Sequence, residues 1–205
     1  VTAMDTNIGR LLDWVEAHDL VRDTLIVFGS DNGFSCGHHG FWGKGNGTYP
    51  RNMYENSVKV PFLMSQPGVL PEGQAVSSLV SAYDFMPTLL DLLGLPLPEG
   101  RNLPGHSVAP LLTGGAAATR ELVCVYDEYG PVRMIRTEEW KYVYRHGYGY
   151  NELYDLVNDP GERENLANVP SQHARLRELR GEMEAWFARH VEADKDGLRE
   201  PDTGD

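Results

Sequence analysis

The clearest signal of architecture lies in residues 24–33, which read TLIVFGSDNG. The first half is a continuous apolar run rich in β-branched residues, which is typical of a strand buried on both faces of a sheet. The second half places a carboxylate, Asp31, and an amide, Asn32, directly after that strand. Ligands of open α/β sheets gather beyond the carboxyl ends of the strands, so both side chains are candidate ligand-binding groups. The competing interpretation of Asp-Asn-Gly is a simple turn, since Asn and Gly both tolerate positive φ.

The segments around this strand alternate between helix and strand. Apolar residues recur at helical spacing over residues 1–15, and an apolar run at residues 60–64 indicates a second buried strand. Residues 81–93 predict a helix that opens on a Ser-x-x-Asp capping box and ends before Gly94. This alternation predicts an α/β part of the chain.

The residues after about position 120 follow a different pattern. Short runs rich in Val, Ile and Tyr succeed one another at short spacings, which is typical of an antiparallel meander, and a helix closes the unit. The expected strands are residues 122–126, 132–137, 140–145 and 152–156, and the expected helix is residues 171–190. We therefore predict an α/β part over residues 1–115, a small antiparallel-sheet plus helix subdomain over 116–191, and a disordered tail over 192–205.

The composition excludes several classes of function. The 205 residues include 18 Lys and Arg against 30 Asp and Glu, a formal net charge of −12, so we expect neither nucleic acid nor an anionic membrane as a partner. No apolar run approaches the ~20 residues that span a bilayer. The two cysteines, Cys36 and Cys124, exclude a disulfide scaffold and favour a cytoplasmic location, while a periplasmic or secreted location and a homo-oligomer remain open.

The long loop after residue 33 adds groups that suit an anionic substrate. Carboxylate and amide oxygens at Asp31 and Asn32 are the hard ligands that Ca²⁺ and Mg²⁺ prefer. Lys44 offers a positive charge on a flexible stem, and His39 could donate a proton or bind a substrate hydroxyl. Each residue also has an ordinary interpretation, because a lone Lys is usually solvated and adjacent histidines can simply fill a loop.

Five segments in order resemble the C-terminal part of sulfatases, in the alkaline-phosphatase-like superfamily of metal-dependent ester hydrolases. They cover residues 1 to about 190 together with the helices around them. The segments are SDNG at 30–33 with HG at 39–40 and GKG at 43–45, YENSVKVP at 54–61, YDFMPTLL at 83–90, GHSVAPLL at 105–112, and ELYDL at 152–156 followed by DP at 159–160 and NL at 165–166.

The resemblance implies both a fold and a site. The fold would be the C-terminal part of a sulfatase-like sandwich, with a mostly parallel buried sheet and flanking helices, plus a small α+β subdomain. Asp31 and Asn32 would be ligands of a divalent cation, normally calcium, with magnesium or manganese as alternatives. Lys44 would contact the sulfate of a small sulfated substrate. His39 would contact the substrate or its leaving group, with His38 as the competing assignment.

Departures from the family pattern bear on activity. Sulfatases carry a C/S-x-P/A-x-R motif whose Cys or Ser is oxidised to formylglycine, and neither Cys36 nor Cys124 lies in such a motif. The paired Asp residues that complete the family's metal site are also absent, and Lys59 replaces an Arg. We therefore expect the nucleophile and the remaining ligands to come from an N-terminal part of the catalytic domain, and the chain alone to be inactive.

Three functions remain open at this stage. The leading one is a sulfuric ester hydrolase, which Asn32 in place of His favours. The second is a phosphonate or phosphodiester hydrolase of the same superfamily. The third is a non-catalytic binding domain derived from such an enzyme, although the joint presence of Asp31, Asn32 and Lys44 disfavours it.

Overall fold

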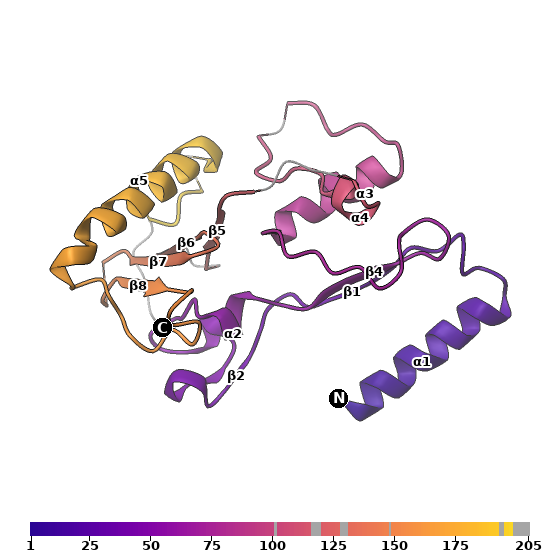
Figure 1. Cartoon of the computed structure of the whole chain (residues 1–205), viewed down its shortest axis with the longest axis horizontal. Coiled ribbons are helices and arrows are strands. Elements are labelled where there is room, and N and C mark those ends of the chain that lie inside the picture. The colour runs from indigo at the N-terminus through magenta and orange to yellow at the C-terminus, as the bar shows by residue number, and fades with distance from the viewer. Residues whose placement is uncertain (101, 116–119, 128–130, 148, 193–194, 199–205) are drawn as a thin grey trace.

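The computed structural model of the chain describes residues 1–100, 102–115, 120–127, 131–147, 149–192 and 195–198. Helices and strands are mixed along the chain, with a long final helix beside an antiparallel sheet (Figure 1). The predicted α/β class with a small α+β C-terminal part is thereby confirmed. None of the helices in the described ranges is long and apolar enough to cross a membrane.

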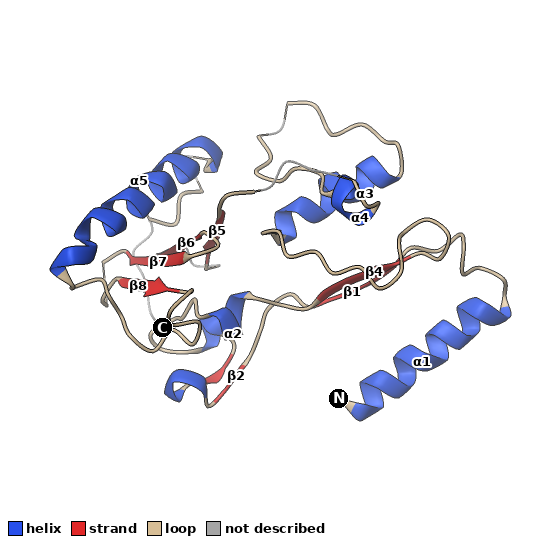
Figure 2. Ribbon diagram, in the orientation of Figure 1, coloured by secondary structure: helices blue, strands red, loops and turns tan. Residues whose placement is uncertain are grey.

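The C-terminal part is a four-stranded antiparallel sheet covered by one helix (Figure 2). The strands are β5 (Val123–Tyr126), β6 (Val132–Arg136), β7 (Trp140–Arg145) and β8 (Glu152–Asp155), paired in that order, and the helix is α5 (His173–His190). Ile135 lies opposite Tyr142, and Tyr142 opposite Leu153, so one face of the sheet presents large apolar side chains. Leu179, Met183 and Phe187 of α5 pack onto this face. The predicted meander and closing helix are therefore confirmed.

The N-terminal part is more extended. Helix α1 (Thr2–Ala17) leads to a two-stranded ribbon of β1 (Ile26–Gly29) and β4 (Phe62–Ser65), and it lies apart from the other helices (Figure 1). Between the two strands of the ribbon lie a small hairpin, β2 (Ser35–Cys36) with β3 (Trp42–Gly43), and the short helix α2 (Glu55–Val58). Helices α3 (Phe85–Leu92) and α4 (Ala109–Leu112) follow.

One expectation about this part is wrong in detail. Strands β1 and β4 pair antiparallel, with Ile26 opposite Ser65, and not as neighbours in a parallel sheet. A parallel pair needs a crossover, usually a helix, and the segment between these strands holds one four-residue α-helix and two short 3-10 turns. Neither strand is buried on both faces, because Val27, Phe62 and Leu63 are exposed.

The start of α3 matches its sequence signal. The Ser81 amide donates to Asp84 Oδ2 at 2.9 Å, and the two residues form the predicted capping box around a turn of 3-10 helix, Ala82–Asp84. Gly94 has φ 66° just after the helix, where a left-handed residue is favourable. Asp84 is fully buried and also binds the His106 amide and the Arg120 guanidinium.

The predicted division at residue 115 stays a prediction. The first residues of the second unit, 116–119, and residues 193–194 and 199–205 of the predicted disordered tail lie outside the described residues.

Candidate functional site

Asp31 and Asn32 form a tight turn directly after β1. The Asn32 amide donates to Asp31 Oδ1 at 2.9 Å, and the Ser30 hydroxyl donates to the Asn32 carbonyl at 2.7 Å. The Asp31 side chain is exposed and that of Asn32 is partly exposed. The turn therefore presents a carboxylate and a side-chain amide to solvent at one end of the β1–β4 ribbon.

Two glycines bring the two ends of the following loop to the same place. The Gly33 amide donates to the Ser57 carbonyl at 2.9 Å, and a Cβ at Gly33 would overlap the Asn56 carbonyl. The Gly45 carbonyl accepts the Asn52 amide at 3.0 Å, and a Cβ at Gly45 would lie 2.6 Å from the Asn52 carbonyl oxygen. Only glycine permits both approaches. The turn after Asn32 and the turn after Lys44 thus pack against residues 52–57.

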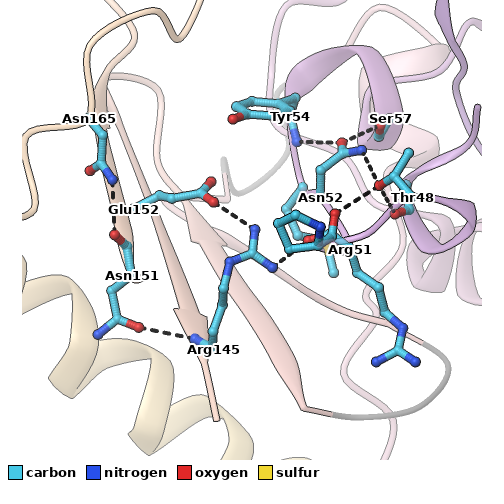
Figure 3. Close-up of polar contacts among 12 residues, drawn as sticks. Thr48, Arg51, Asn52, Tyr54, Ser57, Arg145, Asn151, Glu152 and Asn165 are labelled. Carbon is cyan, nitrogen blue, oxygen red and sulfur yellow. Dashed lines mark hydrogen bonds and ion pairs between the residues drawn. The ribbon is translucent and has the colours of Figure 1, made fainter. Parts of the chain in front are cut away.

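The 52–57 segment is held by hydrogen bonds. Asn52 and Ser57 are buried, and the Ser57 hydroxyl donates to Asn52 Oδ1 at 2.6 Å. The Asn52 amide group donates to the Thr48 hydroxyl at 2.9 Å (Figure 3). Lys44 precedes the 3-10 turn Gly45–Gly47, and its side chain is exposed. The predicted cation ligands and the predicted sulfate-binding lysine are therefore attached to one packed segment.

The two candidate histidines lie in different environments. His39 has a left-handed backbone, φ 54°, and its ring stacks on Tyr54 with centroids 3.7 Å apart and planes 4° apart. The neighbouring His38 accepts the Cys36 amide at its Nδ1, 3.3 Å away. The structure thus gives His39, and not His38, a fixed aromatic support.

The sequence did not predict the charged side chains near the four-stranded sheet that bind residues 51–55. Lys141 on β7 is fully buried, and its Nζ donates to the Met53 carbonyl at 3.0 Å and to Glu162 Oε1 at 2.6 Å. Glu162 Oε2 accepts the Glu55 amide at 2.7 Å. Lys141 also forms an ion pair with Glu55 at 2.7 Å. The contact between Lys141 and Met53 spans 88 positions and leaves no spacing signal in a single sequence.

A second charged pair acts in the same way. Arg145 on β7 pairs with Glu152 at 2.6 Å and donates to the Arg51 carbonyl (Figure 3). Arg145 is buried, so these bonds form out of contact with most solvent. The backbone of residues 51–55 is therefore held by side chains of the four-stranded sheet.

These contacts shift two pKa values. Burial by itself would raise the pKa of Glu55, but the cations Lys141 and Arg136 outweigh it and hold that pKa below its usual value. Burial raises the pKa of the Tyr54 phenol. Glu55 therefore stays a carboxylate and Tyr54 a neutral phenol at neutral pH.

The donor set suits a hard divalent cation only in part. Asp31 and Asn32 supply oxygen donors of the kind such an ion takes. Ca²⁺ takes six to eight oxygens, and in the described part of the chain no group of three or more His, Cys, Asp or Glu residues could hold a metal ion. Asp31 and Asn32 therefore fit a cation as members of a larger set of ligands.

Comparison with known proteins bears on this arrangement. Residues 37–189 match the family described as N-sulphoglucosamine sulphohydrolase, C-terminal. A choline-sulfatase of Rhizobium meliloti is 34% identical over 174 residues, which are 83% of this chain and 32% of the relative. The chain thus spans about a third of the length of this curated relative.

Solved structures show the same likeness. A structure in complex with its substrate D-glucosamine-2-N,6-O-disulfate superposes with a TM-score of 0.83 and 29% identity, over 98% of this chain and 41% of that one. A phosphonate monoester hydrolase of Agrobacterium radiobacter superposes with a TM-score of 0.78 and 29% identity, over 91% of this chain and 39% of that one.

Proposed function

The chain belongs to the sulfatase family, and from this premise we propose that the protein carrying it hydrolyses a sulfate ester. The observation that carries the proposal is the packing of residues 30–59. Gly33 and Gly45 bring the Asp31–Asn32 turn and the Lys44 turn against one buried segment. An oxygen donor pair and a cation on one packed segment suit an anionic group held beside a metal ion.

In this proposal each predicted residue has one role. Asp31 and Asn32 hold a divalent cation, calcium in first place and magnesium or manganese otherwise. The ion supplies positive charge that binds and orients the sulfate. Lys44 binds a sulfate oxygen and offsets the charge that develops on the ester oxygen. His39 contacts the leaving group or a substrate hydroxyl, and His38 remains the alternative for that contact.

The remaining parts of the site belong outside these residues. The family's formylglycine motif and paired Asp ligands have no counterpart in the sequence. We propose that another part of the catalytic domain supplies them. Large apolar side chains on α1 and the β1–β4 ribbon are exposed, Leu11, Trp14 and Leu63 among them, which supports such a partner part.

The second candidate is a phosphonate monoester hydrolase. The structure from Agrobacterium radiobacter favours it, because its overlap with this chain is nearly as good as that of the sulfated-sugar complex. Both reactions place an anionic tetrahedral group in the same kind of site, so only the substrate distinguishes them.

The test compares two aspartates at opposite ends of strand β1. Asp31→Ala should lower kcat/KM for an aryl sulfate by about 10²-fold or more, because the metal loses a ligand worth several kcal/mol. It should also abolish the rise in melting temperature that Ca²⁺ produces in the unmodified protein. Asp23→Ala, at an exposed residue before the strand, should change neither.

Two results would contradict the proposal. An Asp31→Ala protein that keeps its rate would remove the metal role of this turn. A protein that cleaves an aryl phosphonate monoester faster than the matching sulfate ester would establish the second candidate.

A further inference from the structure

The ring of His39 is fixed more firmly than its exposure indicates. Its backbone is left-handed, a conformation that costs energy for a non-glycine residue, and its imidazole lies flat on the Tyr54 ring at 3.7 Å. A parallel contact at this distance favours ring orientations that keep the imidazole on the Tyr54 face. The plane of the imidazole is therefore set by Tyr54.

Tyr54 is supported on the side of the sheet. Its ring contacts the ring of Tyr154 on β8, with centroids 6.0 Å apart. The Tyr154 hydroxyl donates to Glu152 Oε2 at 3.3 Å, and Glu152 is paired with Arg145. Tyr154, Glu152 and Arg145 are all buried. The aromatic contact thus rests on side chains that have little freedom to move.

The backbone beside Tyr54 is held as well. The amide of the next residue, Glu55, donates to the carboxylate of Glu162, and Lys141 binds both the Met53 carbonyl and Glu162. Glu162 itself adopts a left-handed backbone, φ 51°, in a buried position. A strained, buried residue persists only where its surroundings enforce it. Here its carboxylate completes the support of the Tyr54–Glu55 peptide.

We propose that Tyr54 is a positioning residue that fixes the plane of the His39 imidazole at the substrate side of the site, with the Lys141–Glu162 pair and Tyr154 holding Tyr54 in place. The proposal rests on the proposed function in assigning the His39 ring a contact with substrate. The ring face of Tyr54 makes the contact with His39, whereas its phenol hydroxyl shares a hydrogen bond with the Tyr154 side chain. The four-stranded subdomain therefore contributes to the site through Tyr54 without touching substrate.

The first measurement uses NMR on the unmodified protein. The His39 ring protons should show nuclear Overhauser contacts to the Tyr54 ring and resonate upfield of those of His173, an exposed histidine at the start of α5. Tyr54→Leu should move the His39 signals to the position of an exposed ring, whereas Tyr54→Phe should leave them in place. Absence of the Overhauser contacts in the unmodified protein would overturn the proposal without any variant.

The second measurement separates positioning from a general structural role. Tyr54→Leu should lower kcat for the sulfate ester by about 3–10-fold, the size of an aromatic contact, with little change in KM. Tyr54→Phe should restore the rate. In the His39→Ala background, Tyr54→Leu should cause no further loss, because the two residues act as one unit.

Each arm has a result that counts against the proposal. Additive losses in the double variant, or a rate in Tyr54→Phe as low as in Tyr54→Leu, would overturn it. The methyl signals of buried Val143 report whether the variants remain folded. If the protein that carries this chain together with the rest of the catalytic domain hydrolyses no sulfate ester, the proposed function fails, while the NMR arm still decides whether Tyr54 sets the His39 ring.

Discussion

Two regions of the molecule differ in how far their apolar side chains are buried. One is the four-stranded sheet with α5, and the other is α1 with the β1–β4 ribbon. In the sheet, Ile135, Tyr142 and Leu153 are fully buried beneath α5. The apolar residues of α1 also recur at helical spacing, but no residue of α1 is buried, and Leu11 is 67% exposed. The difference shows that an apolar pattern predicts which face of an element will be covered, whereas only the fold shows what covers it.

The candidate site lies between these two regions, and more of its contacts come from the sheet than from the ribbon. The Asp31–Asn32 turn leaves the exposed ribbon, but the loop that follows is held from the sheet by Lys141, Glu162 and Arg145. We infer that the conformation of the loop after Asn32 depends more on its contacts with the four-stranded sheet than on the ribbon.

The largest expected effect comes from breaking the buried ion pair. Lys141→Met leaves Glu162 buried without its partner, because the carboxylate has only 1% of its side chain exposed. The free energy of unfolding should fall by about 3–5 kcal/mol. Denaturation in guanidinium chloride, followed by tryptophan fluorescence, measures it.

The matched control is the exposed pair of α5. Arg180→Met removes a partner of Glu184, and since both side chains are about half exposed, the change should stay within about 0.5 kcal/mol. Combining Lys141→Met with Glu162→Gln should recover part of the loss. A double variant no more stable than Lys141→Met would show that packing, and not charge, is responsible.

The next effect compares one leucine from each region. Leu153→Ala empties space in the core beneath α5 and should cost about 2–5 kcal/mol. Leu11→Ala on α1 should stay within about 0.5 kcal/mol in a protein of these 205 residues, because the side chain packs against little. Equal losses at the two positions would mean that α1 is buried in solution, and the comparison between the regions would fail.

The C-terminal part was predictable because its signals are local. Runs of Val, Ile and Tyr at short spacings are enough for a meander, since antiparallel neighbours need only tight connections. The helix that closes it begins at His173, two residues after the predicted start, behind a short 3-10 turn at Pro170–Gln172. The capping box at Ser81 was also visible, because its two partners stand three residues apart.

The rest depends on contacts between distant residues. The antiparallel pairing of β1 with β4 depends on the path of the loop between them, and an apolar run at residues 24–28 is the same in either orientation. Tyr54 and His39 meet because the loop packs back on residues 52–57 at Gly33 and Gly45. Neither a tyrosine nor a histidine predicts this contact by its residue type. In the sequence, Lys141 is one polar residue of an alternating strand pattern. Its role becomes visible only in the structure, where its Nζ binds the Met53 carbonyl and Glu162.

The smallest expected effect is a pH dependence in the link between the loop and the sheet. The pKa of Glu55 is lower in the folded protein than its usual value, because Lys141 and Arg136 outweigh the effect of burial. A carboxyl group of this kind contributes stability above its unfolded pKa, about 4.3, and loses it as the pH falls through the lower folded value. Glu55→Gln should therefore flatten the acid limb of the stability curve below about pH 4.3 and leave its shape near pH 7 unchanged. The loss should be smaller than in Lys141→Met, because Glu162 still pairs with Lys141 and accepts the amide of residue 55. Stability measured from pH 2 to 7 checks this, and an acid limb equally steep in both proteins would mean that other carboxylates govern it.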